Sequence, residues 1–153
     1  MINIQKGNII IPNYDNTIGK GLRKCDLMNS KFYADYLHSV EDTPKPYCWF
    51  SFKPVNMLDY SIRIETGFNR QKLDILRIRV VENDSLPYED GSIEIETLRK
   101  QKNDEFLQML AGKPAFINTI KPYPLTVYKF SWGEIKSILS PLSATSFIDF
   151  LYQ

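Results

Sequence analysis

Alternation of apolar and polar residues between positions 47 and 81 constrains the fold of this chain more than any other feature. In residues 47–53, 60–65 and 73–81, apolar side chains recur at every second position, the repeat of a half-buried β-strand. Cys48, Phe50 and Phe52 share one side of the first segment, and Arg77 and Arg79 share the polar side of the last. With a turn at residues 67–70, we predict three consecutive antiparallel strands.

Shorter apolar runs predict further strands. Residues 9–11 form such a run, which pairs with residues 2–4 in a hairpin, and residues 115–120, 125–131 and 147–152 form others. Residues 135–139, which end before Pro141, do not distinguish strand from helix. Between the aromatic segments, Trp132 and Gly133 mark a turn. We expect Trp132 in the core, with direct contact to a binding partner as the alternative, and Gly133 to allow close backbone approach or a positive φ.

Two segments carry the spacing of a helix. The first is residues 30–40, where Ser30 is suited to cap the N-terminus and apolar residues from Phe32 to Val40 form one face. The second is residues 96–111, with Gly112 as the C-terminal stop and Asn103 and Asp104 as a point where it could be divided. The whole pattern predicts a single α+β domain over residues 1–153, with a central antiparallel sheet of about six to eight strands and two helices.

Composition narrows the class of protein. The 153 residues include 19 basic and 18 acidic side chains, which argues against direct nucleic-acid binding. Cys25 and Cys48 lack the spacing of a metal or redox motif; one disulfide is an alternative, but free thiols are favoured. No signal peptide and no apolar run of about 20 residues is seen, so we expect a soluble, cytoplasmic protein with no membrane partner. The oligomeric state stays open.

Residues suited to catalysis are scarce. His38 is the single histidine, and we expect it near the end of the first helix, where an imidazole interacts with the terminal carbonyls; a general base is the alternative. No carboxylate pair, paired cysteines or nucleotide-binding glycine motif stands out. We therefore expect no catalytic residues, no metal and no cofactor, and a protein that is not an enzyme.

Acidic residues are concentrated in one segment. Residues 82–96 contain acids but no lysine or arginine, whereas the strands before them carry Arg63, Arg77 and Arg79. One interpretation is a solvated loop beside a basic sheet face. The other is an acidic docking surface with Leu86 and Tyr88 as apolar anchors, which would give fast, salt-sensitive association with a basic partner.

A loose resemblance favours the second interpretation. A helix ending in Leu110-Ala111-Gly112, the segment from Tyr128 to Ser137 and the final strand from Ser146 to Tyr152 resemble the C-terminal part of small bacterial immunity proteins of polymorphic toxins. Upstream, the strand within residues 67–81 also fits. The chain differs from that pattern at Ser140-Pro141 and in lacking tryptophans before the second helix.

The resemblance implies that the protein binds the C-terminal domain of one cognate toxin, as in contact-dependent growth inhibition, and occludes its active site. We expect the toxin to be a nuclease, since nucleases are basic where they bind phosphates and their inhibitors acidic. The alternatives are docking through the arginine-bearing sheet face, or a generic, non-enzymatic module that binds a protein or small ligand. The expected toxin-binding residues are Glu82, Asp84, Tyr88, Glu89, Asp90, Glu94 and Glu96.

Overall fold

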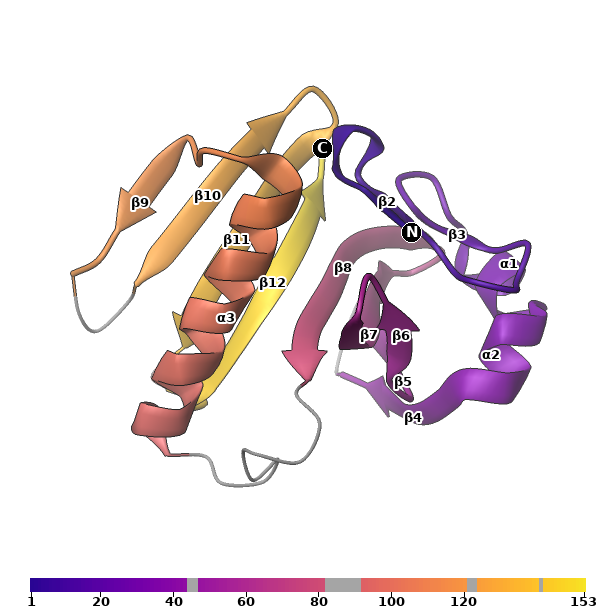
Figure 1. Ribbon diagram of the computed structural model, residues 1–153. Helices are drawn as coiled ribbons and strands as arrows, with labels where there is room; N and C mark the ends of the chain where they lie inside the picture. The colour runs from indigo at the N-terminus through magenta and orange to yellow at the C-terminus, as the bar shows by residue number, and fades with distance from the viewer. Residues whose placement is uncertain (44–46, 82–91, 121–123, 141) are drawn as a thin grey trace.

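The described residues form one large antiparallel sheet, one small sheet and three α-helices (Figure 1). The computed structural model describes residues 1–43, 47–81, 92–120, 124–140 and 142–153. The small sheet contains β1 (Ile2–Asn3), β2 (Asn8–Ile10) and β3 (Thr17–Gly19), with a 3-10 turn, η1 (Ile4–Lys6), between the first two. The helices are α1 (Lys24–Met28), α2 (Lys31–Tyr36) and α3 (Ile93–Ala111).

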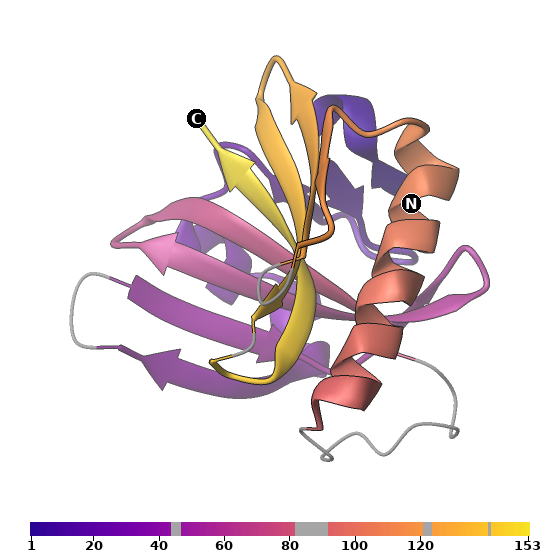
Figure 2. The ribbon, with the colours of Figure 1, turned by 90° about the vertical axis from the view of Figure 1, so that its left-hand side faces the viewer.

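The large sheet has nine strands in the order β4-β5-β7-β8-β12-β11-β10-β9, with β6 paired to β7 outside this path. Its strands are β4 (Leu37–Asp42), β5 (Tyr47–Phe52), β6 (Val55–Met57), β7 (Tyr60–Asn69), β8 (Lys72–Val81), β9 (Phe116–Asn118), β10 (Leu125–Phe130), β11 (Gly133–Ser140) and β12 (Thr145–Tyr152). Figure 2 shows how strongly the sheet twists, as β10–β12 run upright where β4–β8 cross the view. The α+β prediction is confirmed, with a larger sheet than expected.

One face of the large sheet carries the core. Phe50 and Phe52 of β5, Ile64 of β7 and Phe150 of β12 are almost completely buried on it, as period-two alternation requires. The ring of Phe32 in α2 lies 4.7 Å from that of Phe52. On the same face α3 covers the other half of the sheet, packing on β8, β11 and β12. The described helices therefore leave the second face of the sheet open.

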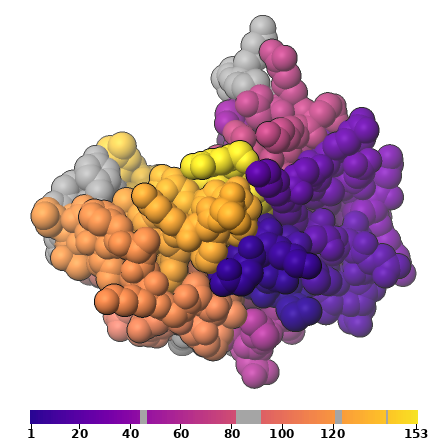
Figure 3. All heavy atoms as spheres, turned by 90° about the horizontal axis from the view of Figure 1, so that it is seen from above, coloured from indigo at the N-terminus to yellow at the C-terminus, as the bar shows by residue number. Residues whose placement is uncertain are grey.

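The two ends of the chain meet at this core face. Trp132 Nε1 donates a hydrogen bond to the Ile4 carbonyl (3.0 Å), and Tyr152 Oη donates one to the Gly7 carbonyl (2.9 Å). Figure 3 shows the indigo N-terminal residues against the orange and yellow C-terminal strands. Trp132 is in the core, as predicted, and a Cβ at Gly133 (φ 148°) would collide with the Leu151 carbonyl. The predicted close approach at Gly133 is therefore confirmed.

The first predicted helix is wrong in its second half. Helix α2 begins after Ser30, whose Oγ accepts a hydrogen bond from Tyr33 N (3.1 Å), but it ends at Tyr36. The next residues form β4, because the edge of β5 offers them a strand partner. His38 therefore lies in a strand and does not cap a helix. The two-helix prediction is also wrong, since α1 is a third helix.

Other differences are smaller. Helix α3 is continuous and starts at Ile93, and Gly112 stops it as predicted, with φ 72°. Residues 135–139 lie in β11, and β7 continues through the predicted turn at residues 67–70 as far as Asn69. Cys25 and Cys48 are both free thiols, the first half-buried and the second buried.

Candidate functional site

The open face of the large sheet carries polar side chains in rows across the strands. Register places Ser51 opposite Glu65, Glu65 opposite Arg77, and Arg77 opposite Asp149. The next row along β7 and β8 pairs Arg63 with Arg79. Strand alternation therefore sets three guanidinium groups side by side on one surface.

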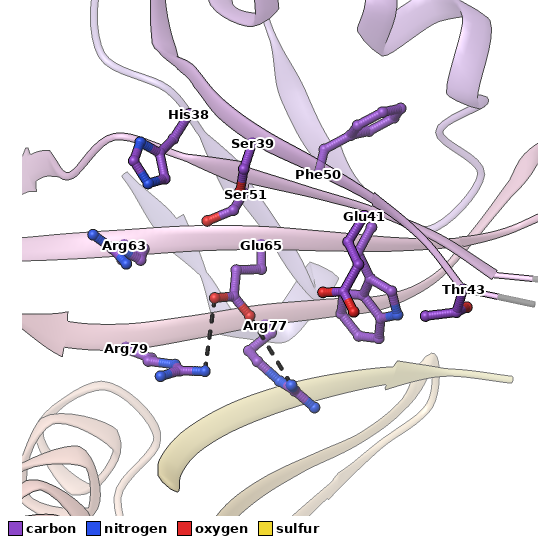
Figure 4. Close-up of a pocket in the computed structure, with 11 residues that line it drawn as sticks. His38, Ser39, Glu41, Thr43, Phe50, Ser51, Arg63, Glu65, Arg77 and Arg79 are labelled. Atoms are coloured by element: carbon purple, nitrogen blue, oxygen red, sulfur yellow. Dashed lines mark ion pairs between the residues drawn. The ribbon is translucent and has the colours of Figure 1, made fainter. Parts of the chain in front are cut away.

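All of these residues except Asp149 line a pocket of about 480 Å³, here named the arginine cleft (Figure 4). Strands β4, β5, β7 and β8 supply its side chains, together with Thr43 just after β4. The lining consists of His38, Ser39, Glu41, Thr43, Trp49, Phe50, Ser51, Arg63, Glu65, Arg77 and Arg79. In Figure 4, His38, Arg63 and Arg79 lie toward one end of the cleft, and Glu41 and Thr43 toward the other. The first end is therefore rich in hydrogen-bond donors.

Arg77 is rigidly held. Its guanidinium donates two hydrogen bonds to Asp149, from Nε to Oδ1 (2.7 Å) and from Nη2 to Oδ2 (3.0 Å). It also lies 3.7 Å from the ring centre of Phe147 and 5.0 Å from that of Trp49. A bidentate, charge-assisted pair between aromatic rings fixes both position and charge. Arg77 therefore forms a fixed wall of the cleft.

Arg63 and Arg79 lie beside Arg77 in the cleft. The carboxylate of Glu65 lies 3.7 Å from Arg79 and 4.0 Å from Arg77, so one anion is shared between two cations. Burial lowers the pKa of the Arg63 guanidinium; the charge of Glu65 opposes this effect, and that of Arg79 adds to it. The like charges of Arg63 and Arg79 thus lie close enough to influence one another.

A second concave surface, here named the acidic groove, lies between α3 and the β9–β10 edge of the sheet. Its volume is about 670 Å³. Helix α3 and the sheet supply its lining: Ile93, Glu94, Thr97, Lys100, Gln101, Asp104, Glu105, Gln108, Ile117, Asn118, Thr119, Pro124, Thr126 and Leu139. Ile93 and Ile117 are 43% and 58% exposed, so apolar surface faces solvent there.

Acidic charge dominates this groove. Among the described residues that line it, the carboxylates are Glu94, Asp104 and Glu105, and the one cation, Lys100, is buried. Lys100 Nζ already binds Asp104 Oδ2 (2.5 Å) and Thr126 Oγ1 (3.2 Å). Glu94 and Glu105 are exposed on α3. A ligand in the groove would therefore meet apolar side chains and carboxylates.

The predicted toxin-binding residues fall into three groups. Glu82, Asp84, Tyr88, Glu89 and Asp90 lie outside the described residues. Glu94 lines the acidic groove. Glu96, by contrast, is only 3% exposed; it accepts a hydrogen bond from Ser146 N (2.5 Å) and pairs with Arg99. Glu96 therefore has an internal role.

The sequence pattern did not predict which side chains come together in the acidic groove and in the arginine cleft. Ile117 was assigned only to a strand, and nothing in its local pattern shows that α3 lies across from it. Asp104 and Glu105 fall within the predicted helix over residues 96–111, and their spacing from Gln101 and Gln108 places them on one helical face. Trp49 and His38 join the arginine cleft only through the pairing of β4 with β5.

Metal sites and membrane-spanning helices among the described residues, and similarity of the chain to known proteins, also bear on function. Among the described residues, no group of three His, Cys, Asp or Glu side chains is arranged to hold a metal. Within that same part of the chain, no helix is both long and apolar enough to cross a membrane. Comparison of the chain with models of known families, with curated proteins and with solved structures finds no match.

Proposed function

We propose that this chain is a binding protein that neutralises a partner, in the manner of an immunity protein for a bacterial toxin. The acidic groove is its docking site, and a basic segment of the toxin's C-terminal domain, a nuclease by the charge argument above, is the occupant. One observation carries the proposal: the groove has apolar side chains open to solvent, and the accessible charges among its described residues are carboxylates.

The apolar part supplies affinity. In the groove, Ile117 of β9 is 58% exposed and Ile93 of α3 is 43% exposed. Such clustered exposed apolar residues, rimmed by polar ones, are typical of protein interaction sites. In addition, β9 ends the strand order of the large sheet, so its outer edge has no strand partner among the described residues. A partner strand could extend the sheet there.

The carboxylates supply selectivity. Glu94 and Glu105 are exposed on α3 beside the apolar surface, and Glu94 lies in the acidic first turn of the helix. Complementary charges around an apolar centre speed association and disfavour partners of the wrong sign. The basic surface with which a nuclease binds phosphates matches this requirement.

The experiment uses the protein encoded beside this one as the candidate toxin. Titration calorimetry measures affinity, and co-expression measures protection of growing cells. Ile117→Asp should weaken binding by at least about tenfold, because it places a charge at an apolar contact; Leu142→Asp is the matched control, since Leu142 is 89% exposed and outside the groove. Glu105→Lys should slow association and reduce its salt dependence, whereas Asp15→Lys, at an exposed acid between β2 and β3, should not.

Three outcomes are informative. Loss of binding in the groove variants alone supports the proposal. Tight binding that is insensitive to both groove variants rejects the groove while keeping a neutralising role. Absence of binding to the candidate toxin, with saturable binding of small apolar molecules in the groove, favours the alternative of a small-ligand module, since the volume of the groove fits that class.

A further inference from the structure

The arginine cleft has a charge distribution that the docking proposal does not use. Along the open face, the row containing Glu65 alternates in sign, because Glu65 lies opposite Arg77 and Arg77 opposite Asp149. The next row contains Arg63 opposite Arg79. Like charges directly opposite one another across two strands destabilise a sheet. This pair is therefore a feature that folding alone does not favour.

Among the described residues, acids hold Arg79 only loosely. Glu65 is 3.7 Å from Arg79, beyond hydrogen-bond distance, and is shared with Arg77. Asp149 is occupied by its two hydrogen bonds to Arg77. Glu41 lies opposite Trp49, one row beyond Glu65 and away from the arginine pair. No described strand places a carboxylate in the row of Arg63 and Arg79.

Burial makes this arrangement costlier. The side chain of Arg79 is 26% exposed, and its Nε is buried with no hydrogen-bond partner among the described residues. Burial lowers the pKa of Arg63 as well, and the charge of Arg79 lowers it further. A buried donor without a partner destabilises the folded state. An oxyanion beside Arg79 would accept the hydrogen bond of this Nε, and its charge would be opposite to those of both guanidinium groups.

We infer that the arginine cleft is a binding site for an oxyanion, a phosphate or a carboxylate, held between Arg63 and Arg79. Arginine's planar fork matches both groups. His38 and the hydroxyl of Ser51 line the same cleft and offer further donors. Arg77, fixed by Asp149, closes one side. A volume of about 480 Å³ admits a small molecule that carries the anion.

The inference is independent of toxin binding, since the cleft and the acidic groove share no residue. The test titrates the full chain with inorganic phosphate and, separately, with malonate, at constant ionic strength set by sodium chloride. Amide NMR shifts follow the titration. Saturable shifts are expected along β7 and β8. Tighter phosphate binding assigns a phosphorylated ligand, and tighter malonate binding assigns a carboxylate ligand.

Variants identify the groups responsible. Arg79→Gln should weaken anion binding by at least about tenfold, because a charge-assisted bidentate contact is lost. Arg70→Gln is the matched control, since Arg70 is an exposed arginine just after β7 and should leave binding unchanged. In anion-free buffer Arg79→Gln should unfold at no lower urea concentration than the wild type, because it removes a like-charge contact.

Several results would overturn the inference. One is the lack of saturable shifts with either anion, and another is equal loss of binding in the Arg79 and Arg70 variants. A third is retention of full affinity in Arg79→Gln when its NMR spectrum shows an intact fold. An Arg63→Gln variant repeats the measurement on the other side of the pair and should lose affinity to a similar degree.

Discussion

Replacing Trp132 with Phe tests how the two ends of the chain are held together. The indole stacks on Phe130 at 5.3 Å between ring centres and on Phe150 at 5.9 Å. Its Nε1 donates to the Ile4 carbonyl, and Gly7 packs so closely on the ring that a Cβ there would collide with it. Phe keeps an aromatic ring in the stack but removes the hydrogen bond and part of the contact with the N-terminal hairpin.

The magnitude follows from these contacts. The Ile4 carbonyl also accepts a hydrogen bond from Gly7 N (3.2 Å), so it keeps one partner, and the lost bond costs about 1 kcal/mol. The smaller ring leaves a partly filled space, which costs about 1–2 kcal/mol by comparison with other core truncations. We expect a total of about 2–3 kcal/mol. With a urea dependence of about 1–3 kcal/mol per molar, the midpoint should fall by roughly 0.7–3 M.

Urea unfolding followed by circular dichroism measures this change. Trp49→Phe is the matched control, because Trp49 is only half-buried on the open face and should cost under about 1 kcal/mol. In the Trp132→Phe variant, amide hydrogen exchange should speed up relative to the wild type more in β1–β3 than in β7 and β8. Equal losses of stability in the two variants, or a loss below about 0.5 kcal/mol at Trp132, would refute the assignment of Trp132 as the link between the chain ends.

Two further predictions concern charged and ionisable core groups. Asp149→Asn should destabilise the fold by about 2–4 kcal/mol in urea, because it leaves Arg77 without its bidentate partner; an Asp149→Asn, Arg77→Met double variant should recover part of this loss, and no recovery would contradict the pairing. Burial raises the pKa of Tyr152 above its ordinary value of 10.0, so the unfolded state releases this proton first and stability should fall above about pH 10 by up to about 1.4 kcal/mol per pH unit. Tyr152→Phe should flatten that fall, and an unchanged slope in urea midpoints between pH 9 and 11 would show that Tyr152 is not its cause.

The local sequence pattern was sufficient to predict an element where a strand alternates between apolar and polar residues, or where a helix ends at a residue suited to the cap. Phe50 and Phe52 indicated their buried face without knowledge of any neighbour, and Gly112 stopped α3 because its positive φ suits glycine. Leu37 and Val40 fit the apolar face of a helix as well as they fit a strand, and their local spacing favours the helix. The pairing of β4 with β5 reversed that choice, and such long-range hydrogen bonding leaves no local signal.

The candidate site was predictable in its charges but not in its grouping. Arg77 and Arg79 were correctly placed on the polar side of a strand, yet their opposition to Glu65 and Arg63 depends on register. Glu96 illustrates the reverse case. It belongs to an acidic run, which suggests exposure, but its carboxylate accepts a hydrogen bond from Ser146 N, 50 residues away. Charge in a sequence therefore identifies a surface only after packing has removed the charges used internally.

A near-zero net charge conceals two surfaces of opposite sign. The acidic groove lies where α3 covers the core face, whereas the arginine cleft lies on the open face of the same sheet. Because successive residues of a strand point to opposite faces, β8 can place Leu76 in the core and Arg77 in the cleft without disturbing either. The sheet thus separates the two charge patterns. A change of charge on one surface should leave ligand binding at the other intact, so each proposal can fail without the other.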